Sequence, residues 1–214
     1  MYKKKSLFVT FEGIEGCGKT YQSRKLFNSL KKAGLPVIYT REPGGTDGAE
    51  KIRKIILSGV KNKFKEKTDT LLYLAARNEH FERKLRPAIL KKNNIICDRF
   101  IDSTLAYQVY GKKINKRFVE QIHKEILGKV KPDLTFILKV NINKAFQRLN
   151  KRRKNKNRYD KFNKSFYSKV QKFFINIANQ NKKRCYVIDN SKDSKNVEKI
   201  ILKKFLNLRK YTHG

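Results

Sequence analysis

The feature that most constrains the fold of this chain is one motif near its start. Residues 13–20 read Gly-Ile-Glu-Gly-Cys-Gly-Lys-Thr and match the pattern G-x-x-x-x-G-K-[ST]. An apolar run at 7–11 precedes the motif, and the pattern of residues 22–33 after it predicts a helix. A buried strand, a glycine-rich turn and a helix N-terminus form the context in which this motif binds phosphate. The sequence therefore predicts a phosphate loop within an α/β fold.

The residue types in this loop suit a nucleoside triphosphate. Glycines let backbone N–H groups turn toward phosphate oxygens, and the N-terminus of the following helix adds positive potential. We expect Lys19 to reach the outer phosphates and the hydroxyl of Thr20 to face Mg²⁺. The apolar residues 94–97 end in Asp98, and an acidic residue after such a strand is the second element that holds Mg²⁺ in phosphate-loop enzymes. Thr20 and Asp98 are therefore the predicted metal ligands.

Short apolar, β-rich runs alternate with helical patterns along the chain, which indicates a single domain over residues 1–214. The runs cover 7–11, 36–40, 94–97, 134–140 and 185–189. The predicted helices cover 22–33, 49–57, 68–92, 103–108, 116–128, 144–151, 162–179 and 196–208. Strands separated by helices imply right-handed crossovers, and therefore a five-stranded parallel sheet with helices on both faces, a three-layer fold. Ligands then bind at the carboxyl ends of the strands, where the motifs lie.

The charge of the chain is extreme, with 53 Lys and Arg against 18 Asp and Glu and a formal net charge of +35. Such an excess is typical of proteins that bind nucleic acid or anionic membranes. Here the basic residues run through nearly every segment instead of forming one tail, and the abundant Lys, Asn and Ile share A/T-rich codons. Drift in genomic base composition is therefore the explanation that we favour, and we expect no specific nucleic-acid partner.

Cysteine usage and hydropathy bear on the compartment in which the protein works. Cys17, Cys97 and Cys185 lack the paired spacing of a disulfide framework or a zinc site, which fits a reducing cytosol. No apolar run approaches the ~20 residues of a membrane span. We therefore expect a cytoplasmic protein that has no membrane partner.

Three arginines near the ends of the predicted strands are candidates for a second phosphate site. Arg41 precedes the tight turn at 42–45, in which the bond before the proline is a candidate for the cis form. Arg99 directly follows the predicted metal ligand, and Arg53 lies on the helix after the turn. A guanidinium binds phosphate with a planar fork, which a lysine ammonium cannot do. We expect Arg41, Arg53 and Arg99 to frame a phosphate.

Tyr73 and Arg77 stand four residues apart, on one face of a predicted helix. An aromatic ring and a guanidinium on one face suit a flat heterocycle, since the ring can stack on it and the guanidinium can donate hydrogen bonds. The alternative, which the spacing alone favours, is that Tyr73 belongs to the core and Arg77 is a solvated charge. The pattern therefore leaves both interpretations open.

Taken together and in order, these motifs resemble those of bacterial thymidylate kinases from about residue 6 to about residue 190. The segments that carry the resemblance are Phe11-Glu12-Gly13 before the loop, 40–46, 71–77, 98–108 and Pro132-Asp133-Leu134. The resemblance implies a nucleoside monophosphate kinase that passes the γ-phosphate of ATP to dTMP, giving dTDP and ADP. It also implies a need for Mg²⁺ and a homodimer.

The resemblance implies a role for each matching residue. Residues that match the ATP loop are Gly13, Ile14, Glu15, Gly16, Cys17, Gly18, Lys19 and Thr20. Residues that match the dTMP site are Glu15, Arg53, Tyr73, Arg77, Arg99, Ser103, Thr104 and Gln108. Within these, Glu15 matches a contact to the sugar, Arg53 and Arg99 match contacts to the phosphate, and Arg77 matches a contact to the thymine edge.

The resemblance further implies a basic lid at about 148–160. Arg158, in Asn-Arg-Tyr-Asp, matches the lid motif Asp-Arg-x-Glu with two departures. Because the lid also carries Arg148, Arg152 and Arg153, the sequence leaves open which arginine reaches the transferred phosphoryl group. The predicted catalytic residues are Lys19, Arg99, Arg153 and Arg158.

Three other functions compete with this interpretation. Another monophosphate kinase, acting on UMP or a deoxynucleoside, would share most of the motifs. A GTPase needs Asn-Lys-x-Asp for guanine, and no such tetrapeptide occurs. A nucleic-acid-binding protein is suggested by charge alone. For a kinase of this kind no strong general base is required, and His80, His123 and His213 all lie outside the phosphate-binding motifs.

Overall fold

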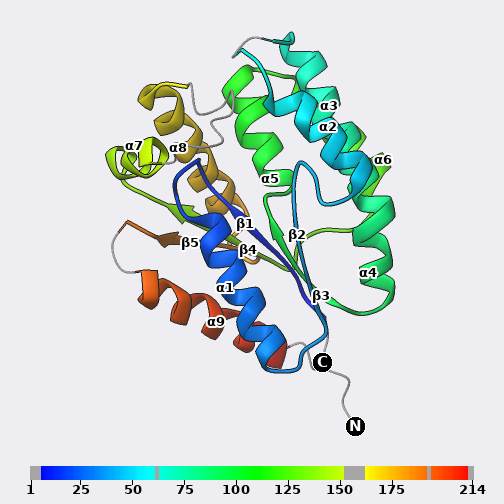
Figure 1. The fold of residues 1–214 in the computed structure, drawn as a ribbon, viewed down its shortest axis with the longest axis vertical. Coiled ribbons are helices and arrows are strands. Elements are labelled where there is room, and N and C mark those ends of the chain that lie inside the picture. The colour runs from blue at the N-terminus through cyan, green and yellow to red at the C-terminus, as the bar shows by residue number, and fades with distance from the viewer. Residues whose placement is uncertain (1–5, 61–62, 152–161, 192–193, 212–214) are drawn as a thin grey trace.

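A parallel β-sheet of five strands forms the centre of the protein (Figure 1). The computed structural model describes residues 6–60, 63–151, 162–191 and 194–211. The strands are β1 (Phe8–Glu12), β2 (Val37–Arg41), β3 (Asn94–Asp98), β4 (Leu134–Lys139) and β5 (Cys185–Asp189). They lie in the order β2-β3-β1-β4-β5, and every neighbouring pair is parallel. The predicted five-stranded parallel sheet is confirmed, with strand boundaries within one residue of those expected from the sequence.

The helices of the described chain connect the strands as crossovers and cover both faces of the sheet (Figure 1). They are α1 (Lys19–Lys32), α2 (Asp47–Leu57), α3 (Glu66–His80), α4 (Arg86–Leu90), α5 (Ile101–Thr104), α6 (Lys116–Leu127), α7 (Ile142–Lys151), α8 (Lys164–Gln180) and α9 (Ser194–Tyr211). Two π-helical segments, η1 (Phe81–Leu85) and η2 (Leu105–Gly111), join them. The predicted three-layer α/β architecture is therefore confirmed.

The single helix expected over 68–92 is instead three segments, α3, η1 and α4. The physical reason is Pro87, which lies in the first turn of α4 and has no N–H to donate to the preceding turn. A wider π-helical turn accommodates this missing hydrogen bond without ending the helix. Residues 103–108, expected as one short helix, likewise belong to α5 and η2.

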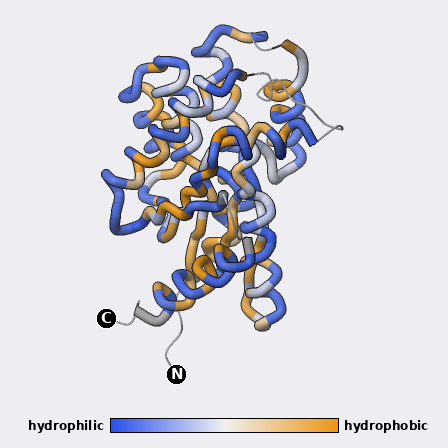
Figure 2. The backbone as a smooth tube through the Cα atoms, turned by 90° about the vertical axis from the view of Figure 1, so that its left-hand side faces the viewer, coloured by the Kyte–Doolittle hydropathy of each residue, from blue (hydrophilic) through white to orange (hydrophobic). Residues whose placement is uncertain are grey.

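Alternate residues of the central strands supply the cores on the two faces of the sheet. Val9 and Ile96 belong to the main core, which includes the buried side of α1. Phe8 and Ile95, one residue earlier on each strand, belong to a second cluster with η1 and α4. All five residues of β1 and of β3 are buried, as expected for strands covered on both faces. Figure 2 shows hydrophilic stretches recurring along the outer helices, which agrees with charge that is spread through the sequence.

Strand β1 is the position at which the chain reverses its direction across the sheet. The chain passes from β1 to β2 and β3 on one side, and then to β4 and β5 on the other. The register aligns Asp98 at the end of β3 with Phe11 of β1 and Arg41 of β2. Ligands of open α/β sheets bind at such a reversal, outside the carboxyl ends of the strands. Among the described residues, no helix has the length and apolar character required to span a lipid bilayer.

Candidate active site

The loop between β1 and α1 has the backbone shape that its glycines predict. Gly13, Gly16 and Gly18 have φ angles of 136°, 74° and 95°. A β-carbon on Gly16 would lie 2.5 Å from the carbonyl oxygen of Ala145, and one on Gly18 would lie 2.4 Å from Nδ2 of Asn190. Both the conformation and the close packing therefore require glycine at these positions.

Lys19 begins α1 and lies almost fully buried at the mouth of the loop. Its side chain is 6% exposed, and its ammonium donates a hydrogen bond to the carbonyl oxygen of Ile14 at 2.6 Å. The side chains of Ile14 and Cys17 are fully buried in the main core. The Lys19 ammonium also lies 3.6 Å from Sγ of Cys17, and Lys19 supplies a positive charge to the loop.

Thr20 and Asp98, the predicted metal ligands, are in direct contact. The Thr20 hydroxyl donates a hydrogen bond to Oδ2 of Asp98 at 2.5 Å. Oδ1 of Asp98 is buried and has no hydrogen-bond partner within the described part of the chain. A hydroxyl and a carboxylate with a free oxygen are the hard donors that Mg²⁺ prefers, with water and phosphate completing its shell. The residues present therefore fit a magnesium ion, although no group of three or more His, Cys, Asp or Glu occurs among the described residues.

One cleft brings together residues from both halves of the predicted site. It extends from the phosphate loop across the ends of β2 and β3 to α2, α3 and η2. The predicted residues that line it are Glu15, Gly16, Gly18, Lys19, Thr20, Arg41, Arg53, Tyr73, Arg77, Asp98, Arg99, Ser103, Thr104 and Gln108. Gly13, Ile14 and Cys17 do not line the cleft, and Arg153 and Arg158 lie outside the described residues.

Arg99 occupies the centre of this cleft in an unusual backbone conformation, with a φ of 75°. Its Nη1 donates to the carbonyl oxygen of Gly13 at 2.9 Å and to the hydroxyl of Ser103 at 3.0 Å, and its Nη2 donates to Glu15 at 2.9 Å. Burial alone would lower the pKa of Arg99, but the acidic groups around it, Glu15 foremost, raise that pKa well above its ordinary value. The guanidinium therefore stays charged and ties the phosphate loop to α5.

Glu15 is held as a carboxylate, and Tyr107 takes part in holding it. Burial raises the pKa of Glu15, but Arg99 and Lys19 more than offset this effect, so the pKa is below its ordinary value. The Tyr107 hydroxyl donates to Oε2 of Glu15, and the Arg99 guanidinium lies over the Tyr107 ring. Tyr107 is not among the site residues predicted from the sequence. Its spacing of four residues from Ser103 on one helical stretch was the signal that could have found it.

Glu12, at the end of β1, is a second residue that sequence reasoning missed. Its fully buried carboxyl group accepts hydrogen bonds from the N–H of Phe100 at 2.7 Å and from the hydroxyl of Ser103 at 2.5 Å. Burial and the nearby Asp102 raise the pKa of Glu12 to about 8. Glu12 therefore fixes the turn between β3 and α5, on which Arg99 and Ser103 lie.

Arg77 is 3% exposed, which shows that the solvated-charge interpretation of this residue is wrong. Its Nε donates to Oε2 of Glu42 at 2.8 Å, and its Nη1 donates to the hydroxyl of Thr104 at 2.9 Å. His80 contacts the other oxygen of Glu42 at 3.0 Å. Burial raises the pKa of Glu42, but Arg77 and His80 lower it below its ordinary value. Tyr73 lies one turn away on α3 and lines the same cleft, so the structure brings the predicted pair together.

The three arginines predicted to frame a phosphate all reach the cleft. Arg53 donates to the carbonyl oxygen of Pro43 at 2.6 Å, next to the peptide bond that the structure has in the cis form. Arg41 pairs with Glu50 at 3.0 Å. Burial and the nearby positive charges, Arg41 first and Arg99 to a smaller extent, lower the pKa of Arg53. The three guanidinium groups bring positive charge together in one cleft, and charge of this kind favours the binding of an anion.

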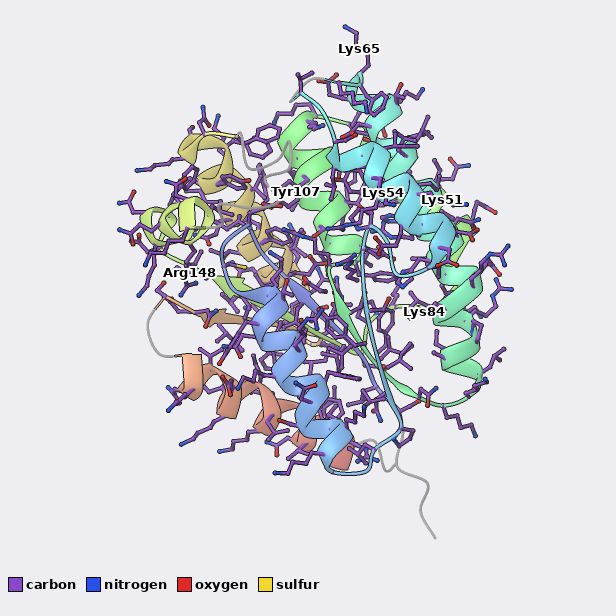
Figure 3. All side chains as sticks on the ribbon, viewed as in Figure 1. Lys51, Lys54, Lys65, Lys84, Tyr107 and Arg148 are labelled. Carbon is purple, nitrogen blue, oxygen red and sulfur yellow. The ribbon has the colours of Figure 1, made fainter. Side chains whose placement is uncertain are left out.

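The elements around the cleft carry both buried residues that line it and lysines that are exposed to solvent. Figure 3 shows Tyr107 on η2, whereas Lys51 and Lys54 extend from α2. Arg148, from the predicted lid region, donates from α7 to the carbonyl oxygens of Gly16 at 3.1 Å and Asn190 at 3.2 Å. The rest of the predicted lid lies almost entirely outside the described residues.

Comparisons with known proteins agree on one family. The sequence profile of the thymidylate kinase family matches residues 11–201. A thymidylate kinase of Wolbachia pipientis wMel is 42% identical over 184 residues, which cover 85% of this chain and 90% of the relative. A thymidylate kinase of Ehrlichia ruminantium (strain Gardel) is 41% identical over 196 residues, which cover 91% of this chain and 93% of that relative. The crystal structure of thymidylate kinase from Ehrlichia chaffeensis matches with a TM-score of 0.77 and 34% identity, covering 94% of this chain and 99% of that one. The chain therefore belongs to the thymidylate kinase family.

Proposed function

We propose that this protein is a dTMP kinase, which transfers the γ-phosphate of ATP to dTMP and gives dTDP and ADP for dTTP biosynthesis. The observation that carries the proposal is the single cleft that joins the phosphate loop to the arginines and to the Tyr73–Arg77 face. Two nucleotides bound at its two ends would meet through their phosphates. Family membership supports the same conclusion.

ATP would bind with its phosphates in the loop at 13–20. The N–H groups there and the N-terminus of α1 supply positive potential, and Lys19 adds a charge at the loop mouth. Mg²⁺ held by Thr20 and Asp98 would neutralise charge on the outer phosphates. The free Oδ1 of Asp98 supports this assignment.

dTMP would bind at the other end of the cleft. Arg53 and Arg99 would hold its phosphate, and the Glu15–Tyr107 pair would lie beside its sugar. Tyr73 would stack on the base, and Arg77 would donate to a carbonyl oxygen of the thymine edge. Nε2 of Gln108 supports this pocket, because it is buried and has no hydrogen-bond partner among the described residues. A donor of this kind in a pocket wall suits a polar ligand.

The transfer itself would need positioning and charge neutralisation rather than a general base. The acceptor is a phosphate oxygen, which is anionic near neutral pH. Arg99 would draw the acceptor phosphate toward the loop, since its guanidinium lies between Gly13 and Ser103. On the resemblance, Arg153 and Arg158 would close over the transferred group and exclude water.

The test is an ADP-coupled assay of the purified protein with ATP and each common nucleoside monophosphate. We expect dTMP to be the preferred acceptor, with dUMP lower because it lacks one methyl group, a difference of about 1–3 kcal/mol. A clear preference for UMP or for a purine monophosphate would replace the proposal with another kinase of the same class. Absence of phosphoryl transfer to every acceptor would overturn it.

We also propose a cytoplasmic homodimer. All three cysteines are described, buried and unpaired, which supports a reducing compartment. Exposed apolar side chains on α2 and α3, Ile55 and Leu71, support a partner surface there. Sedimentation equilibrium should give twice the chain mass of 25.2 kDa, and a mass of one chain at micromolar concentration would contradict the dimer.

A further inference from the structure

His123, on α6, contacts the buried Arg77 although it does not line the cleft. Among the described residues, four groups contact the Arg77 guanidinium. The carboxylate of Glu42 lies on the Nε and Nη2 edge, with Nη2 at 2.7 Å, and the Thr104 hydroxyl and Nε2 of His123 both lie at Nη1. The Phe100 ring lies against the guanidinium, 5.3 Å from its central carbon. Every one of these groups comes from a different element or turn.

The contact fixes the protonation state of His123. A guanidinium has donors only, so Nε2 of His123 has to accept, and the imidazole proton has to be on Nδ1. A protonated His123 would instead place a second cation against Arg77. Burial and the charge of Arg77 agree with this, because they lower the pKa of His123 to about 2. The histidine is therefore a neutral acceptor across the whole working pH range.

We propose that His123 is a positioning residue for Arg77 and, through it, a determinant of nucleobase specificity. This inference rests on the proposed function and extends it to a residue outside the cleft. Glu42 fixes one edge of the guanidinium, and His123 and Thr104 fix Nη1, so the remaining Nη2 hydrogen has one direction in which to point. When an apolar residue replaces His123, a buried Nη1 hydrogen of Arg77 loses its acceptor. Because an unsatisfied buried donor costs free energy, we expect the guanidinium to rotate.

The orientation of Arg77 discriminates between pyrimidines by simple chemistry. Thymine has a carbonyl oxygen at position 4, which accepts a hydrogen bond from a guanidinium. Cytosine has an amino group there, which cannot accept one. A correctly aimed Arg77 therefore favours dTMP over dCMP, and an Arg77 that turns away loses this preference without affecting the ATP end of the cleft.

The experiment compares wild type with His123→Leu, His123→Ala and His123→Gln. The first two variants, here called the loss variants, both remove the acceptor, so the test requires only one of them to fold. The amide of His123→Gln keeps an acceptor. Gln121→Leu, an exposed polar-to-apolar change on the same helix, is the matched control. For each, kcat and KM are measured with dTMP, dCMP and ATP, together with the melting temperature.

We expect the loss variants to raise KM for dTMP by about 10-fold or more, as for one hydrogen bond to a charged group. The dTMP to dCMP ratio of kcat/KM should fall by a similar factor, and KM for ATP should stay within about twofold. His123→Gln should recover most of the loss, and Gln121→Leu should behave as wild type. A structural role alone would lower stability and all rates together, without rescue.

An unchanged dTMP to dCMP ratio in a folded loss variant, or equal losses for dTMP and ATP, would overturn the role of His123. These outcomes differ from failure of the proposed function, which would appear as a wild-type protein inactive on dTMP. That result would overturn the proposed role of His123 together with the proposed function.

Discussion

Individual side chains in the cleft show how buried charges are kept in place for chemistry. Arg99 and Glu15 pair at 2.9 Å, and Arg77 and Glu42 pair at 2.7 Å, and all four groups carry additional hydrogen bonds. A buried ion pair is tolerated only when its remaining donors and acceptors are satisfied. The loop lysine differs, because its ammonium contacts a carbonyl oxygen and a thiol.

Lys19→Met should therefore abolish most of the turnover with little effect on the fold. The positive charge at the loop mouth would be lost, and removal of one such group from a preorganised site costs on the order of 10²–10³ in kcat. Lys25→Met, on the outer side of the same helix where the lysine is 48% exposed, is the matched control. A variant with near-normal kcat and an unchanged melting temperature would contradict the role of Lys19.

Glu12→Gln should remove a pH dependence of stability. The pKa of Glu12 rises from an ordinary value of 4.5 to about 8 in the folded protein, with burial as the main cause. Between these pH values the folded state holds a proton that the unfolded state releases, so stability is lost as pH rises through this window. Urea midpoints of wild type should fall relative to those of Glu12→Gln between pH 5 and pH 8. Parallel curves would contradict the raised pKa.

At the level of elements, the proposed base pocket lies between α3 and the α5–η2 segment. Arg77 of α3 bonds to Thr104 at 2.9 Å, and Lys112 after η2 bonds to Asp69 of α3 at 2.7 Å. These two contacts lie at the two ends of the facing helical stretches. The spacing of four between Tyr73 and Arg77 predicted a shared face, but the partners across the pocket could not be predicted, since they depend on how two helices pack.

Lys112→Met should destabilise the protein through Asp69. Asp69 is fully buried and Lys112 is 12% exposed, so the change leaves a buried carboxylate without its lysine. Breaking a buried pair from one side costs about 3 kcal/mol or more. The double variant Asp69→Asn with Lys112→Met should recover part of that loss, because it removes the charge as well. If the two substitutions lower the free energy of unfolding in urea additively, the two residues act independently.

At the scale of the whole molecule, the sequence predicted the architecture well and the site in part. Strands such as β3 are continuous apolar runs bounded by polar residues, so their limits follow from the sequence. The π-helical segments did not follow from the apolar pattern, because η1 arises next to Pro87 and η2 packs against helices such as α8 that are distant in the sequence. Glu42 and His123 could not be assigned either, since their role depends on a contact with Arg77 across 35 and 46 residues of sequence.

The net charge of +35 predicts a side activity of the whole molecule. The protein should bind DNA without sequence preference, with a Kd on the order of 10⁻⁴–10⁻⁶ M at physiological salt. The logarithm of this Kd should rise linearly with the logarithm of the salt concentration. DNA should not stimulate ATP hydrolysis, whereas dTMP should support ATP turnover. Fluorescence anisotropy with two unrelated duplexes tests the first statement, and the coupled assay tests the second. Stimulation by DNA in the absence of dTMP would favour a nucleic-acid-dependent function.

The proposed activity requires that two nucleotides meet through their phosphates in one basic cleft. A crystal structure with dTMP and a non-hydrolysable ATP analogue tests it most directly. We predict triphosphate oxygens within hydrogen-bond distance of the loop at 13–20, the dTMP phosphate at Arg53 and Arg99, and thymine at Arg77. Thymidine density away from Arg77 and Arg99, or the analogue outside the loop, would contradict the account.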